Sequence, residues 1–140
     1  MFPKIYGKKN SIVLEYKDKI ILAGKQPYDN IPKFIASSDI CLLPAYKNEV
    51  MKNIVPIKMY EYMAAGKPVI ATSLPGIMKE FGNDNGVLYV DRPEDALKKA
   101  LELVENGCIE EEGRKARKFV EKYSWDSITD EFEGVLRELT

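Results

Sequence analysis

Four short runs of apolar residues constrain the fold more than any other feature of this sequence. They cover residues 20–23, 40–43, 69–71 and 87–90, and each is apolar throughout instead of alternating with polar residues. Such runs are typical of parallel strands that helices cover on both faces of a sheet. Turn-forming or charged residues bound them, among these Gly24, Pro44, Pro68 and Asp91.

Helical patterns separate and follow the apolar runs. They predict helices over residues 30–37, 56–65, 77–81, 93–106, 110–122 and 124–139. In the fourth helix we expect a core face made of Ala96, Leu97, Ala100, Leu101 and Val104. Ser124 is placed to cap the last helix. Strands alternating with helices indicate an α/β fold, a Rossmann-like parallel sheet with helices on both faces.

The chain length fits one domain. We expect residues 1–18 to form a helical or irregular segment, in which Ile5, Ile12, Val13 and Tyr16 are spaced like a helix face. Residues 19–140 form the domain itself.

Charge and cysteine content exclude several functions. Lys and Arg number 21 against 22 Asp and Glu, so nothing indicates a general nucleic-acid binder. The sequence has no apolar run of about 18 residues, as a membrane-spanning helix would need. Cys41 lies in an apolar run and Cys108 in a polar turn, which fits neither a disulfide framework nor a zinc site. Histidine is absent. We therefore expect a reducing, cytoplasmic location and no metal or other cofactor.

Residues 56–72 carry the most chemistry: a helix begins near Pro56, stops at Gly66 and leads into a buried strand. The free N–H groups of a helix start bind anions, and Lys58 adds a positive charge in that turn. Glu61 follows one turn later, where a carboxylate can accept hydrogen bonds from ribose hydroxyls. Equally, Lys58 and Glu61 can form a solvated ion pair. Tyr60, Tyr62 and the methionines are more typical of a core, and the small residues 64–66 of close packing.

This stretch resembles the P-x-K-x-x-E-Y-M-A-x-G-K-P-V-I run of retaining glycosyltransferases of family 4 (glycosyltransferase group 1), which have the GT-B fold. Other segments are similar to the same family in the same order: residues 20–24, the IPKFIASSDICLLP run that ends at Pro44, residues 85–90, and Tyr123-Ser124-Trp125-Asp126. The likeness covers about residues 19–136 and corresponds to part of the C-terminal, donor-binding half of the GT-B fold.

The resemblance implies a role for several residues. Glu61 matches the glutamate that binds the ribose, and Lys58 matches a lysine that contacts the donor diphosphate; these two are the candidate catalytic residues. The N–H groups of Ile57 and Met59 would support the same phosphates. Gly24, Lys25 and Gln26 match a loop that passes the base, and Pro44 and Ala45 match the loop where the sheet opens to the donor.

Two departures from the family pattern stand out. Many members carry a second glutamate where this chain has Asn53, and the nearest earlier acid is Glu49, which we interpret as a solvated charge. The family's sheet also has two strands, and a whole acceptor-binding domain, for which this chain shows no counterpart. We therefore expect either a gap or exposed sheet edge, closed by a partner subunit or a second copy, or direct pairing of the strands at residues 20–23 and 40–43.

The resemblance implies transfer of a sugar from a UDP- or GDP-sugar, with retention, to an acceptor glycan or lipid bound by a missing N-terminal domain. Attachment to the inner face of the membrane is one possible setting for such an enzyme. The competing hypothesis is a non-catalytic nucleotide-binding module or a subunit of a split glycosyltransferase. A nucleotide-sugar epimerase is a weaker alternative, because such enzymes need acids and histidines that this chain lacks.

Overall fold

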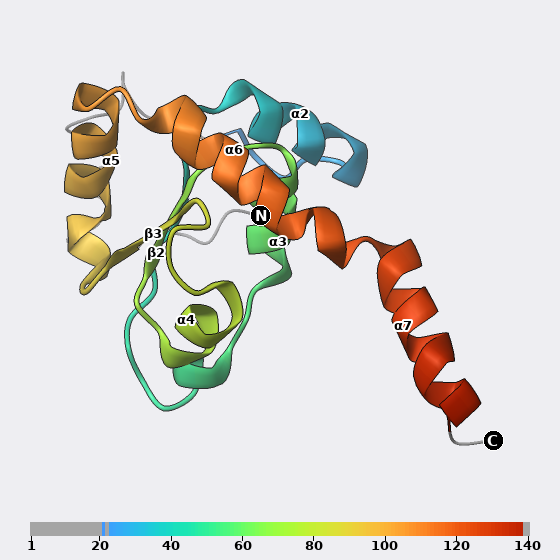
Figure 1. The fold of residues 1–140 in the computed structure, drawn as a ribbon. Helices are drawn as coiled ribbons and strands as arrows, with labels where there is room; N and C mark the ends of the chain where they lie inside the picture. The colour runs from blue at the N-terminus through green and yellow to red at the C-terminus, as the bar shows by residue number, and fades with distance from the viewer. Residues whose placement is uncertain (1–20, 22, 139–140) are drawn as a thin grey trace. The chain divides into compact units, whose positions relative to one another are not determined.

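The computed structural model describes residue 21 and residues 23–138 of the chain. These residues form three strands, six α-helices of at least seven residues each, and short 3-10 turns (Figure 1). In chain order the elements are η1 (Tyr28–Asn30), α2 (Ile31–Ser37), β1 (Cys41–Leu43), η2 (Met51–Asn53), α3 (Ile57–Ala64), β2 (Val69–Thr72), α4 (Pro75–Phe81), β3 (Val87–Val90), η3 (Pro93–Asp95), α5 (Ala96–Glu105), α6 (Ile109–Val120), η4 (Glu121–Tyr123) and α7 (Trp125–Glu138).

The chain divides into two compact units, Met1–Lys33 and Phe34–Thr140, whose relative positions are not determined. The predicted boundary between residues 18 and 19 and the proposed helix face at Ile5, Ile12, Val13 and Tyr16 lie outside the described residues. Of the first predicted strand, Ile21 and Ala23 are described, and neither is in a strand. The expected direct pairing of residues 20–23 with 40–43 is therefore not seen in the described residues.

The second unit contains a parallel sheet in the order β1-β2-β3, as the apolar runs predicted. Cys41 lies opposite Val69 in the first pair of strands, and Val69 lies opposite Val87 in the second. All four residues of the central strand β2 are buried. Within the described residues, the outer edge of β1 has no strand beside it.

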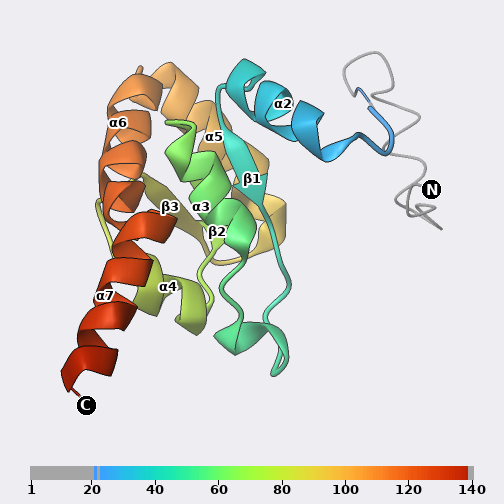
Figure 2. The same cartoon turned by 90° about the vertical axis from the view of Figure 1, so that its right-hand side faces the viewer.

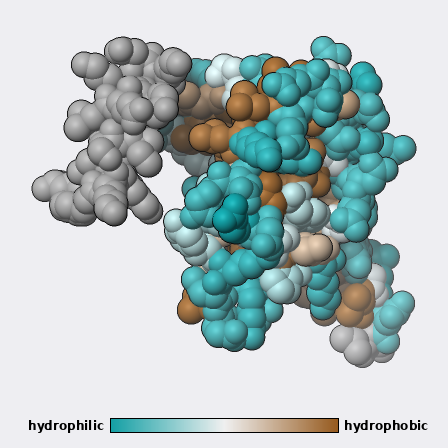
Figure 3. All heavy atoms as spheres, turned by 90° about the vertical axis from the view of Figure 1, so that its left-hand side faces the viewer, coloured by the Kyte–Doolittle hydropathy of each residue, from teal (hydrophilic) through white to brown (hydrophobic). Residues whose placement is uncertain are grey.

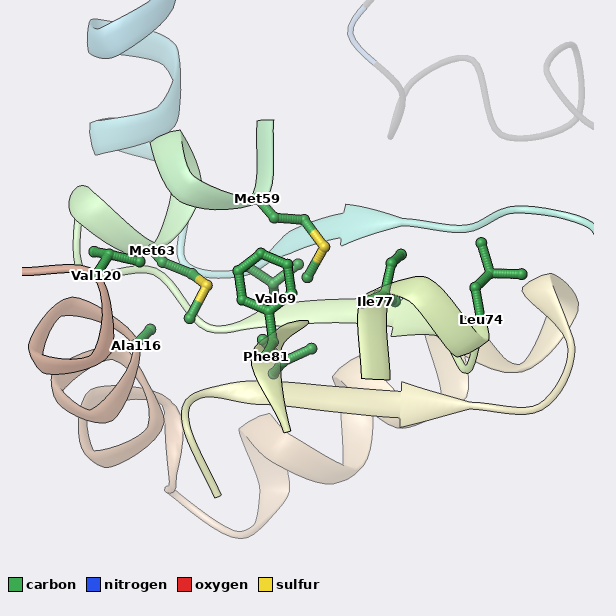
Figure 4. Packing of buried hydrophobic residues seen from close by; sticks show 10 residues of the cluster. Met59, Met63, Val69, Leu74, Ile77, Phe81, Ala116 and Val120 are labelled. Atoms are coloured by element: carbon green, nitrogen blue, oxygen red, sulfur yellow. The ribbon is translucent and has the colours of Figure 1, made fainter. Parts of the chain in front are cut away.

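Helices cover both faces of this sheet, which confirms the predicted fold class. On one face a core forms between the sheet, α3, α4 and α6; Figure 4 shows its side chains pointing toward one another. Its fully buried members include Met59, Met63, Ile77 and Phe81. The methionines of α3 are thus core residues, as expected. On the other face α5 contacts β2 and β3, where Ile70 and Val90 pack against Ala96.

The predicted core face of α5 is wrong in three of its five residues. Leu97, Leu101 and Val104 are 68%, 62% and 54% exposed, whereas Ala96 and Leu103 are buried. Figure 3, which views the molecule from the α5 side, shows apolar surface among the hydrophilic residues there. The helix therefore rests on the sheet along a narrower stripe, rotated from the one that the apolar spacing favoured.

The ends of two helices follow the signals in the sequence. At the end of α3, the N–H of Gly66 bonds to the Met63 carbonyl and the N–H of Lys67 to the Tyr62 carbonyl, which is the hydrogen-bond pattern of a Schellman cap. Gly66 has a φ of 71°, which suits glycine. At the start of α7, the Ser127 N–H donates to the Ser124 Oγ at 3.1 Å, so Ser124 is the predicted cap. Every described residue of α7 is exposed.

Candidate functional site

The candidate site lies where α3 begins. After β1 the chain passes through residues 44–56 and returns as α3, which runs back along the sheet in the direction opposite to β1 (Figure 2). The start of α3 therefore lies toward the carboxyl ends of the strands, the edge at which open α/β sheets bind their ligands. Pro56 precedes the helix in an extended conformation, and no side chain of the described residues caps the helix start. Its first amides remain available to an anion.

Lys58 and Glu61 stand on this first part of α3. The Lys58 side chain is exposed and Glu61 is half-buried. Neither forms an ion pair or a side-chain hydrogen bond with another residue in the part of the chain that the structure describes. The described residues therefore show no direct ion pair between Lys58 and Glu61.

The two residues that flank Lys58 differ in their surroundings. The Ile57 side chain is 76% exposed. The Met59 side chain is fully buried in the core, and its N–H donates to the Pro56 carbonyl at 3.1 Å. The amide of Met59 is therefore already bonded, contrary to the expectation that it would support a phosphate. The amides of Ile57 and Lys58, which have no acceptor within an α-helix, remain as the donors of the first turn.

Pro44 and Ala45 directly follow β1, at the same edge of the sheet as the start of α3. Pro44 is exposed and Ala45 half-buried. The Ala45 N–H donates to the hydroxyl of Thr72, the last residue of β2, at 3.0 Å. This hydrogen bond ties the loop that follows β1 to the neighbouring strand.

Gly24, Lys25 and Gln26 belong to the first unit of the chain, so the structure does not place them relative to Lys58 and Glu61. Gly24 has a φ of 79°, and the Gln26 side-chain amide donates to the Ala23 carbonyl. These two features describe a tight turn. Their part in binding a nucleotide base stays a prediction.

Glu49 and Asn53 lie in the region where many family members carry a second glutamate. Glu49 is 88% exposed and pairs with Lys52, as expected for a solvated charge. Asn53 ends η2, and its backbone lies directly against Gly76 of α4. Thr72 and Gly76 were not identified from the sequence, because no local pattern marks a contact between residues so distant along the chain.

The described residues also form a hollow that does not include the candidate site. It lies between α3, α6 and η4, and none of the predicted site residues lines it; the lining consists of Tyr60, Ala64, Arg117, Val120, Glu121, Tyr123 and Ser124. Burial is the main cause that raises the pKa of Tyr60 well above its usual value, and a hydrogen bond to Glu80 is the second. The Tyr60 ring also packs at a tilt against Phe81 and edge-on against Tyr123. Its phenol therefore stays neutral and serves the aromatic core.

In the part of the chain that the structure describes, no group of three or more histidine, cysteine, aspartate or glutamate residues is gathered as a metal site. No helix there has the length and apolar character that crossing a bilayer would require.

The parallel sheet with helices on both faces is the architecture of a GT-B type domain. The model of the family "Glycosyl transferases group 1" matches residues 7–130, so the chain belongs to this glycosyltransferase family. The match covers every segment on which the resemblance was based except the end of the last helix.

Among curated proteins, the chain is 30% identical over 128 residues to the uncharacterized glycosyltransferase MJ1607 of Methanocaldococcus jannaschii. That alignment covers 89% of this chain and 32% of the relative. A shorter match, 32% identical over 60 residues, joins 43% of the chain to 15% of TuaH of Bacillus subtilis (strain 168), a glycosyltransferase named for teichuronic acid biosynthesis. The chain thus spans a third or less of the length of these relatives.

Among solved structures, the chain is similar to sucrose-phosphate synthase (tll1590) from Thermosynechococcus elongatus. The TM-score is 0.73 at 22% sequence identity, over 94% of this chain and 33% of that one. At this identity the likeness shows the fold alone, and it confirms the predicted α/β arrangement of sheet and helices.

Proposed function

We propose that this chain is the donor-binding domain of a glycosyltransferase that takes its sugar from a nucleotide diphosphate sugar and transfers it with retention of configuration. The observation that carries the proposal is the start of α3, where Lys58 and Glu61 have no ion-pair partner, and the helix end no side-chain cap, among the described residues. Membership of the glycosyltransferase family supports it.

In this scheme Lys58 and the amides of Ile57 and Lys58 bind the diphosphate of the donor. Negative charge grows on that diphosphate as its bond to the sugar breaks, so a cation and helix-end donors stabilise the leaving group more as the reaction proceeds. Glu61 accepts hydrogen bonds from the ribose hydroxyls and orients the nucleoside. The scheme routes no step through a metal ion. The acceptor, a glycan or lipid, would be bound by a separate domain.

The test is calorimetric titration of the folded chain with UDP and GDP, with ADP as a comparison. We expect UDP or GDP to bind more tightly than ADP. Lys58→Ala should weaken the binding at least tenfold, and Glu61→Gln should weaken binding of the nucleotide more than binding of pyrophosphate alone. Lys98→Ala, which removes an exposed lysine from α5, is the matched control and should change nothing.

Unchanged affinity in both Lys58→Ala and Glu61→Gln would overturn the assignment of the site. Nucleotide binding without sugar transfer, in a protein that also carries an acceptor domain, would favour the alternative of a non-catalytic module. Dependence of transfer on a separately added polypeptide would favour the split enzyme.

A further inference from the structure

One short segment, residues 72–76, holds both ends of the loop that joins β1 to α3. At the first end, the Ala45 N–H donates to Thr72 Oγ1 at 3.0 Å. Thr72 is fully buried, and among the described residues it is the one buried polar side chain. A buried hydroxyl needs a partner, and so does a loop amide, so each of the two groups fixes the other.

At the second end, the backbone of Asn53 lies against Gly76. A Cβ atom at Gly76 would stand 2.9 Å from the carbonyl carbon of Asn53 and 3.1 Å from its Cα and its oxygen. Side-chain carbons do not approach backbone atoms so closely, and backbone atoms cannot move aside as a flexible side chain can. Glycine at position 76 is therefore required for η2 to rest on α4.

The segment that holds the loop is itself fixed. The Ser73 N–H donates to the Val90 carbonyl of β3 at 2.8 Å, and the Leu74 N–H to the Thr72 carbonyl at 2.7 Å. The Leu74 side chain is buried in the core. Residues 72–76, which make the two contacts with the loop, are thus themselves bonded to both β2 and β3.

The loop carries two parts of the proposed donor site at its ends. Pro44 and Ala45 open it, and only residues 54–56 separate Asn53 from the start of α3 and Lys58. We propose that Thr72 and Gly76 are positioning residues of the donor site: they hold Ala45 and the start of α3 in a fixed relation, so that the diphosphate meets prearranged groups. This inference rests on the proposed function, and neither residue touches the substrate.

The experiment compares Thr72→Val, which has nearly the same shape but lacks the hydroxyl, with Thr72→Ser, which keeps it, and with Gly76→Ala. Amide hydrogen exchange is measured on the ligand-free chains, calorimetry gives the affinity for UDP and GDP, and thermal unfolding monitors the core. We expect Thr72→Val to speed exchange at Ala45 at least tenfold while amides of β2 and β3 stay protected. Nucleotide affinity should fall at least tenfold, and Thr72→Ser should restore both.

Gly76→Ala should act at the other end, with faster exchange at residues 51–57 and the same loss of affinity. Should that variant fail to fold, the two Thr72 variants decide the question by themselves. Unchanged exchange at Ala45 in Thr72→Val would overturn the proposal, and so would faster exchange with unchanged affinity. If the wild-type chain binds neither nucleotide, the proposed function fails; the exchange rates at Ala45 then still support or overturn the fixing of the loop.

Discussion

The carbonyl oxygen of Gly66 lies where a side chain at Gly113 would begin: a Cβ atom at Gly113 would stand 2.3 Å from that oxygen. Gly113 is buried within α6, and Gly66 ends α3. The two helices therefore meet backbone to backbone at this point, just before β2 begins.

Replacing Gly113 by alanine should lower the free energy of unfolding. Alanine favours a helix by about 1 kcal/mol over glycine, but inserting a carbon into a packed contact costs about 1–3 kcal/mol, and here the obstacle is backbone. Gly134→Ala is the matched control, because nothing lies within 4 Å of its added carbon in α7. Urea unfolding followed by circular dichroism should show a loss for Gly113→Ala only. Equal effects in the two variants would contradict the close approach of α3 and α6.

Phenylalanines at positions 81 and 132 should respond very differently to truncation. Phe81 is fully buried, so Phe81→Ala should cost about 3–5 kcal/mol. Phe132 of α7 is 61% exposed, so Phe132→Ala should change stability by no more than about 0.5 kcal/mol. Both values come from chemical unfolding of the same chain. A large cost at Phe132 would mean that α7 packs against the body of the domain.

Tyr89 should make stability depend on alkaline pH. Burial raises its pKa to about 12, and its hydroxyl donates to the Gly82 carbonyl at 2.8 Å. Its pKa in the unfolded chain is about 10, so the neutral phenol stabilises the fold fully below that pH, and this contribution is lost as the pH rises through 12. Tyr89→Phe should lower the free energy of unfolding by about 1 kcal/mol near pH 8. The difference in free energy of unfolding between this variant and the wild type should narrow between pH 10 and 12.

Chemical unfolding of the wild type and of Tyr89→Phe at several pH values tests this prediction. The ionisation of the other tyrosines and of the lysines is common to both proteins and cancels in the comparison. A gap that stays constant up to pH 12 would rule out the raised pKa of Tyr89.

The two cysteines should react with a thiol reagent at different rates. Cys41 is only 8% exposed, and burial raises the pKa of its thiol, so little reactive thiolate forms. Cys108 is half-buried in the turn before α6. At pH 8 we expect Cys108 to react rapidly and Cys41 slowly, with both reacting fully in guanidinium. Cys108→Ser should remove the rapid phase; a rapid phase that persists would show that Cys41 is accessible.

Much of the fold was predictable because its signals are local. Glycine at position 66 and serine at position 124 mark a helix end and a helix start, and both act as predicted. The continuous apolar runs at residues 40–43, 69–71 and 87–90 identified the strands Cys41–Leu43, Val69–Thr72 and Val87–Val90, because a strand covered on both faces is apolar at nearly every position.

The face of α5 could not be predicted in the same way. The apolar residues of this helix form one broad stripe, and the packing of the helix decides which part of that stripe is buried. Ala96 and Leu103 are buried, whereas Leu97 and Leu101 are exposed.

In the candidate site, too, local patterns could be recognised in the sequence and long-range contacts could not. Lys58 and Glu61 could be proposed from the sequence, because a proline, a lysine and a glutamate spaced along one helix start form a local pattern. The contact of Thr72 with Ala45 spans 27 positions in the chain, and that of Gly76 with Asn53 depends on how α4 meets η2. Such contacts arise from tertiary packing, which no periodicity in the sequence encodes.

The parallel arrangement of the strands has a consequence for how the chain folds. Cys41 must find Val69, and Val69 must find Val87, and in each case a helix lies between the partners along the chain. The entropy of closing these loops is lost before the strand contacts repay it. The domain should consequently fold more slowly than a helical bundle of its size. The rate-limiting step should be the docking of α3 and α4 around β2, because neither strand pair can close until the crossover that precedes it has formed.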